Sequence, residues 1–125
     1  MFTIEIERTG DVSVARCSGR MVRGDAVRNL REAVVSERDI RVVVLDLSDV
    51  KSLDAGGLTA LISLHLWARH REIQIKLVNP CRFVREMLER THLNCVFDIS
   101  SLEAALQVLR EPDYRGPRNA AWLIA

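Results

Sequence analysis

The segment VVVLDLSDVKSLDAGGL, residues 42–58, is the most informative part of the sequence for predicting the fold. It opens with an unbroken run of aliphatic residues, and such a run within Arg41–Leu47 is typical of a strand that is covered on both faces inside a sheet. We expect a turn at Ser48–Asp54, after which the adjacent glycines Gly56 and Gly57 open a helix. The pattern predicts a central strand followed closely by a helix.

The residues before this stretch predict a β-hairpin and a first helix. Hydrophobicity alternates along Phe2–Glu7 and along Val12–Ser18, and the turn residues Thr9–Asp11 separate the two segments. Gly24 and Asp25 can then start an amphipathic helix. Its apolar side comprises Val27, Leu30, Val34 and Val35. The domain should therefore open with two antiparallel strands.

The residues after the stretch predict a further alternation of strand and helix. The helix that the glycine pair opens should run to about His70, and Ile73–Val78 should form the next strand. Asn79 and Pro80 fit the N-cap and the first position of a third helix, which ends near Arg90. We expect the buried stripe of this helix to comprise Phe83, Val84, Met87 and Leu88.

The last third of the chain predicts one more strand, one more helix and a tail. Cys95–Phe97 can form a short edge strand, and Ser100 with Glu103 makes a capping box for a last helix. That helix would turn inward Leu102, Ala105, Leu106 and Leu109. We expect residues 1–110 to form one domain and residues 111–125 to form a C-terminal tail that is flexible or docked.

These elements predict an α/β fold. It would contain a mixed β-sheet of about 4–5 strands with about four α-helices, in which an N-terminal β-hairpin precedes βαβ units. A chain of 125 residues has the size of one domain with one core.

The composition excludes several classes of protein. A net charge of +1 is too small to attract nucleic acid by itself. No apolar run approaches the roughly 20 residues that span a bilayer, so we expect no membrane insertion. Charged and apolar residues alternate at the N-terminus, unlike the core of a signal peptide, so we expect a cytoplasmic protein. Cys17, Cys81 and Cys95 are scattered, which fits a reducing compartment and predicts three small apolar packing residues.

The order of the predicted elements, together with Leu45–Val50 and Leu53–Leu58, resembles the STAS domain. That family comprises the anti-sigma factor antagonists and the cytoplasmic domains of sulfate transporters. The resemblance covers roughly residues 2–110, and Val42–Leu64 is its most specific part. It implies a STAS-like fold and a function in binding other proteins.

The resemblance also implies a regulatory site directly after the central strand. In the family this segment usually reads Asp, Ser, Ser or Thr, Gly, Leu, and a partner kinase that doubles as an anti-sigma factor phosphorylates the first hydroxyl. Here Asp54 matches the acid and Leu58 matches the leucine, whereas Ala55 and Gly56 stand at the two hydroxyl positions. The domain is then either a partner-binding module that stays unphosphorylated or a member of a branch that never used phosphorylation. An alanine side chain cannot accept phosphate, so we expect no phosphorylation at Ala55.

The same segment and the helix after it predict a partner-binding face. On a helical wheel, one side of the helix gathers Leu58, Leu61, Ile62 and Ala68, and we expect it to face the core. The predicted partner-binding residues are Asp54, Ala55, Gly56, Gly57, Thr59, Ser63 and Trp67. Trp67 is either an interface anchor or a cover for a neighbouring helix.

Three further side chains near this face have open roles. Ser52 and Thr59 are hydroxyls that could take a phosphate in place of residue 55, although most such hydroxyls are structural. His65 points to the core side of the wheel and is expected to be a structural, hydrogen-bonded histidine.

The resemblance implies a bacterial, non-enzymatic protein-interaction module of the anti-sigma factor antagonist type. It would bind an anti-sigma factor or serine-kinase-like partner and so regulate transcription, without the usual serine switch. The alternative is a cytoplasmic STAS subunit of an ABC-type membrane transporter complex, and a homodimer stays open. The chain has no GxSxG, Walker or HExxH motif, so we expect no enzymatic activity, no cofactor and no metal.

Overall fold

The structure is a computed structural model that describes residues 2–100. These residues form one five-stranded sheet, three α-helices and a short 3-10 helix, η1. The elements are β1 (Phe2–Thr9), β2 (Val12–Met21), α1 (Asp25–Val35), β3 (Val42–Leu53), α2 (Ala55–His70), β4 (Gln74–Val78), α3 (Arg82–Arg90), η1 (Leu93–Cys95) and β5 (Asp98–Ser100). The α/β class and the mixed sheet are confirmed. The described part holds three α-helices instead of about four, and the last predicted helix lies outside it.

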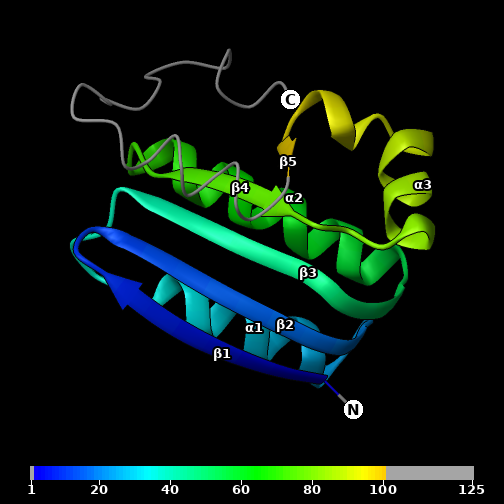
Figure 1. The fold of residues 1–125 in the computed structure, drawn as a ribbon, viewed down its shortest axis with the longest axis horizontal. Coiled ribbons are helices and arrows are strands. Elements are labelled where there is room, and N and C mark those ends of the chain that lie inside the picture. The colour runs from blue at the N-terminus through cyan, green and yellow to red at the C-terminus, as the bar shows by residue number, and fades with distance from the viewer. Residues whose placement is uncertain (1, 101–125) are drawn as a thin grey trace.

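The sheet has the strand order β1-β2-β3-β4-β5. β1 and β2 form the predicted antiparallel hairpin, with Gly10 at a φ of 60° in its turn, and every other neighbouring pair is parallel. Each parallel step needs a crossover, and crossovers of one hand that move in one direction place their helices on the same face of the sheet. Accordingly, α1 and α2 lie on one side of the strands (Figure 1).

β3 is the central strand, as the sequence predicts, but it is longer than expected. Its residues 42–47 are all buried. The strand then continues to Leu53, so the expected turn at Ser48–Asp54 is wrong. Pairing explains the difference, because β2 runs beside β3 as far as the pair Met21 and Leu53, through two register irregularities. Within this segment the Asp46 carboxylate accepts hydrogen bonds from the Ser48 backbone and hydroxyl.

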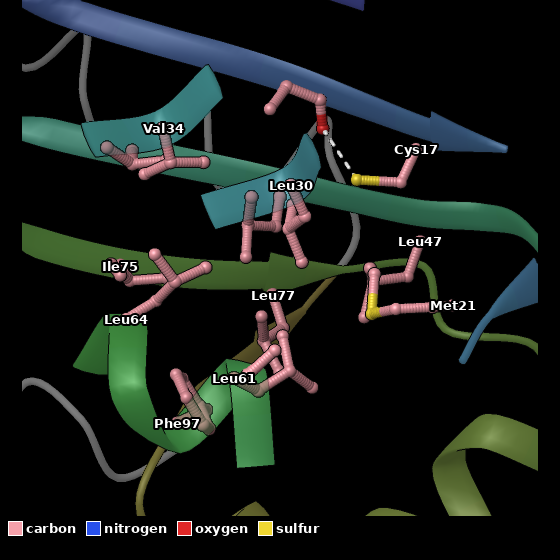
Figure 2. Packing of buried hydrophobic residues seen from close by; sticks show 14 of the residues in the cluster. Cys17, Met21, Leu30, Val34, Leu47, Leu61, Leu64, Ile75, Leu77 and Phe97 are labelled. Carbon is pink, nitrogen blue, oxygen red and sulfur yellow. Dashed lines mark hydrogen bonds between the residues drawn. The ribbon is translucent and has the colours of Figure 1, made fainter. Parts of the chain in front are cut away.

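The main core lies between the sheet and the helices (Figure 2). Leu30 and Val34 of α1 and Leu61 of α2 are buried against Ile75 and Leu77 of β4 and their neighbours. A smaller apolar cluster on the opposite face contains Val42, Val44 and Val78, with Val12 and Val14 packed against it. Because both faces of β3 carry buried aliphatic residues, its sequence has no alternation.

Two boundaries after β4 differ from the sequence prediction. Asn79 is not a helix N-cap: it has a φ of 52°, a left-handed conformation that asparagine tolerates, and Cys81 is the N-cap of α3. The edge strand predicted at Cys95–Phe97 is also displaced. Residues 93–95 form η1, and the edge strand β5 follows at residues 98–100.

Two predictions of burial on the last elements are wrong. Phe83 is 50% exposed on α3, although Val84 and Leu88 of the same stripe are buried. Cys95 is exposed, so only Cys17, buried in the core, fully matches the expected packing role; Cys81 is partly buried. Burial raises the pKa of the Cys17 thiol to about 12, which leaves this cysteine protonated and unreactive at neutral pH.

Candidate functional site

Residues 54–57, which we call the β3–α2 turn, lead from the central strand into α2. Asp54 is the N-cap of α2, and its Oδ1 accepts the Gly57 N–H at 2.9 Å. Both carboxylate oxygens also lie 3.1 Å from the backbone nitrogen of Arg23, in the loop between β2 and α1. Asp54 therefore ties two loops together at one edge of the molecule.

The same contacts stabilise the ionised form of Asp54. The backbone N–H groups, first that of Gly57 and then that of Arg23, hold the pKa of the Asp54 carboxyl below its ordinary value because they stabilise the ionised form. The carboxylate is thus occupied in fixing the turn. These contacts give Asp54 a structural role at the predicted site.

The two glycines allow the turn to approach the β2–α1 loop closely. A Cβ on Gly56 would lie 2.8 Å from Cβ and 2.9 Å from Cα of Arg23. A Cβ on Gly57 would overlap the carbonyl oxygen of Met21 and lie 2.6 Å from Cδ1 of Leu53. A hydroxyl-bearing side chain at residue 56 therefore requires the loop to move.

Ala55 differs from both glycines because it is exposed at the first residue of α2. Helix N-termini present free N–H groups and a positive dipole end, which favour negative charge nearby. The position can accept a larger side chain directed to solvent. It is the accessible point of the β3–α2 turn.

The outward side of α2 borders α1. A groove of about 520 Å³, which we call the α1–α2 groove, contains the three predicted residues Thr59, Ser63 and Trp67. The Thr59 hydroxyl donates to the Ala55 carbonyl at 2.8 Å, and the Arg31 guanidinium donates to the Ser63 hydroxyl. The full lining is Arg31, Thr59, Ile62, Ser63, Leu66, Trp67, His70 and Arg71.

The helical wheel predicts the burial of some residues on this surface wrongly. Ile62 was expected to face the core, yet it is 41% exposed, and Leu66, 51% exposed, was not predicted at all. Apolar residues occur on nearly every side of α2, so its sequence has no clear polar face from which to orient the wheel. Arg31 and Arg71 were also missed as site residues. Their approach to α2 depends on the packing of α1 and on the end of the helix.

The remaining candidates lie apart from the groove. Ser52 is half-buried in β3, where it is paired with Arg20. His65 is buried on the core side of α2, as predicted, and its ring meets that of Phe97 edge-on with 5.5 Å between centroids. Asp54 and the glycines lie at the N-terminal end of α2, whereas Trp67 lies near its C-terminal end.

His65 gives the domain a predicted dependence of stability on pH. Burial, and then the charge of Arg69, lower the pKa of the His65 imidazole below the ordinary value of 6.5. Between the folded and unfolded pKa values the unfolded state binds more protons, so the contribution of His65 is complete above pH 6.5 and is lost as the pH falls toward the folded pKa. Urea midpoints measured across this range should fall more steeply for the wild type than for His65→Gln. Equal slopes in the two proteins would contradict the assignment.

Two negative findings apply to residues 2–100. Within this range, no group of three or more His, Cys, Asp or Glu side chains is placed to hold a metal ion. None of the helices in this range combines the length and the hydropathy that a membrane span requires.

Comparison with protein-family models identifies one family. The family model described as the STAS domain matches residues 3–106. No curated protein matches the chain.

Solved structures of anti-sigma factor antagonists share the fold. The antagonist SpoIIAA in its unphosphorylated form has a TM-score of 0.74 at 17% identity, covering 86% of this chain and 96% of its own. The Bacillus cell fate determinant SpoIIAA in its phosphorylated form has a TM-score of 0.69 at 16% identity, covering 86% and 100%. An anti-sigma factor antagonist from Mycobacterium paratuberculosis has a TM-score of 0.72 at 24% identity, covering 89% and 96%.

Proposed function

This chain belongs to the STAS domain family, and we propose that it is a non-enzymatic binding module of the anti-sigma factor antagonist type. Its partner would be an anti-sigma factor of the serine-kinase-like class. The partner would dock on the β3–α2 turn and on the outward side of α2. By occupying that anti-sigma factor, the module would free a sigma factor and so regulate transcription.

The observation that carries this proposal is the construction of the β3–α2 turn. Asp54 fixes the turn to the Arg23 backbone, the close approach at Gly56 holds it against the loop, and Ala55 is left exposed. A rigid turn that presents one small, accessible residue suits contact with a protein surface, because little conformational entropy is lost when it binds.

We further propose that Ala55 stands where phosphorylated relatives carry their acceptor serine. A phosphate at the first residue of α2 would be tolerated by the helix, since its charge meets free N–H groups and the positive end of the dipole. It would still change the charge of the docking surface. With alanine at residue 55 this module would remain competent to bind at all times.

Capture from the native lysate tests this function. The full chain serves as bait beside Ala55→Glu, which places a permanent negative charge on the turn, and Ala55→Ser, a matched change without charge. Ala55→Glu should leave the free energy of unfolding within about 0.5 kcal/mol of wild type, because the residue is exposed and the helix N-terminus favours an acid.

The identity of the retained protein decides the outcome. In lysate depleted of ATP, where no phosphate can be transferred, wild type and Ala55→Ser should retain an anti-sigma kinase, and Ala55→Glu should retain at least about tenfold less, a difference of roughly 1.4 kcal/mol. Retention of transporter ATPase or permease subunits would instead support the alternative of a subunit in an ABC-type transporter complex. Equal retention of the kinase by Ala55→Glu would show that the β3–α2 turn is not part of the interface.

A further inference from the structure

The α1–α2 groove combines an apolar surface with basic side chains. Ile62 and Leu66 are among the few large aliphatic residues that stay exposed within residues 2–100, and they lie on the same helix as Trp67. The basic residues come from two elements: Arg31 from α1, and His70 with Arg71 from the end of α2. Among the described residues, no carboxylate lines the groove. Its charge is therefore uniformly positive.

Trp67 connects the apolar and basic parts of the groove. The Arg71 guanidinium lies 5.4 Å from the centroid of the Trp67 ring, which holds this cation beside the apolar surface. The indole Nε1 is buried and has no hydrogen-bond partner within residues 2–100. An unsatisfied buried donor is costly, and a small movement that let an acceptor reach it would recover that cost.

The helix dipole does not account for this arrangement. Basic residues in a last helical turn commonly offset the negative end of the dipole, and Arg69 and His70 occupy that turn of α2. Arg31 belongs to α1, however, and its guanidinium reaches across to the Ser63 hydroxyl. Positive charge is thus placed along the groove by two separate helices.

We propose that the α1–α2 groove binds an acidic amphipathic helical segment of the protein partner. Apolar side chains of the segment pack on Ile62, Leu66 and Trp67, while its carboxylates pair with Arg31 and Arg71. Such helix-in-groove binding depends on anchor side chains of the bound helix that are spaced three or four residues apart. The inference rests on the proposed function, because it identifies the chemistry of the segment that the partner contributes.

Charge argues against a second copy of this chain as the occupant in a symmetric dimer. A two-fold contact brings the same patch of both copies together. Arg31 and Arg71 of one copy would then face the same cations of the other, and like charges across an interface are unfavourable. A partner of opposite charge avoids this repulsion.

Selection from a display library of random linear peptides tests the groove without any knowledge of the partner. The full chain is the bait, and enriched sequences should combine Asp or Glu with aromatic or aliphatic residues at helical spacing. Synthetic copies of the enriched peptides, carrying a fluorescent label, are then titrated with the chain and its variants. Enrichment of neutral or basic sequences would overturn the proposal.

Charge reversal locates the binding of the selected peptides. The pair Arg31→Glu with Arg71→Glu should weaken peptide binding at least tenfold, and rising salt should weaken binding to wild type. The matched control is Arg85→Glu with Arg90→Glu, which makes the same change in net charge at exposed positions on α3. Equal weakening by both pairs, or by neither, contradicts a specific acidic ligand of this groove.

Failure of this inference can be told apart from failure of the proposed function. If acidic peptides bind the groove but no anti-sigma kinase is captured from lysate, the groove proposal stands and the proposed function fails. If the kinase is captured equally well by the pair Arg31→Glu with Arg71→Glu, the groove proposal fails instead. Self-association in sedimentation experiments that this pair abolishes would show that a second copy is the occupant, and would also overturn the groove proposal.

Discussion

Phe97→Ala is expected to lower the free energy of unfolding by about 3–5 kcal/mol, the range for removing a large buried aromatic side chain. Phe97 has no exposed surface, belongs to the main core and contacts the His65 ring edge-on. Alanine would leave a cavity beneath the segment that links η1 to β5, because the surrounding residues relax only in part.

Urea unfolding checks this expectation, with Phe83→Ala as the matched control. Phe83 is 50% exposed on α3, so the same chemical change should cost less than about 1 kcal/mol there. A similar shift of the urea midpoint in both variants would contradict the burial of Phe97 and the docking of η1 on the core.

Gly57→Ala should destabilise the domain by about 1–3 kcal/mol, as extra volume does in a site without space. The added Cβ would overlap the Met21 carbonyl oxygen and crowd Cδ1 of Leu53. A backbone carbonyl cannot rotate away as a flexible side chain can. The first turn of α2 must therefore move, and with it the hydrogen bond from the Gly57 N–H to Asp54.

Two measurements separate this local effect from a general loss of stability. Thermal melting should show a lower midpoint for Gly57→Ala, with Ala55→Ser in the same turn close to wild type. At a temperature where both variants are folded, Gly57→Ala should also bind the captured partner more weakly, because the turn that presents Ala55 is displaced. A variant as stable as wild type would show that the close approach to Met21 is wrong.

Most of the fold follows from patterns that are local in the sequence. The aliphatic run of β3, the hairpin turn at Gly10 and the start of α1 at Gly24 each depend on neighbouring residues, and the structure confirms all three. The extension of β3 to Leu53 was missed because it depends on pairing with β2, some 30 residues earlier in the chain. Polar residues such as Ser48 and Asp49 gave no local sign of it.

The candidate site divides in the same way. The resemblance places Asp54 in the site, but its role as the N-cap of α2 was not predicted, because the helix was expected to open at the glycine pair and it begins at Ala55. The second contact of Asp54, with the Arg23 backbone, joins segments that no sequence pattern relates. The exposure of Ile62 and Leu66 depends on how α1 packs beside α2, and a helix that is apolar on most sides does not reveal which side stays uncovered.

We propose that this module binds a kinase-like anti-sigma factor without being switched off by it. To test this, the captured kinase and ATP are incubated with the wild-type chain or with Ala55→Ser. Phosphate incorporation is followed by intact mass, and release of the complex is measured in parallel. We expect that the wild type gains no phosphate and stays bound, whereas Ala55→Ser is phosphorylated at residue 55 and released. Phosphorylation and release of the wild type, at Ser52, Thr59 or any other hydroxyl, would contradict it.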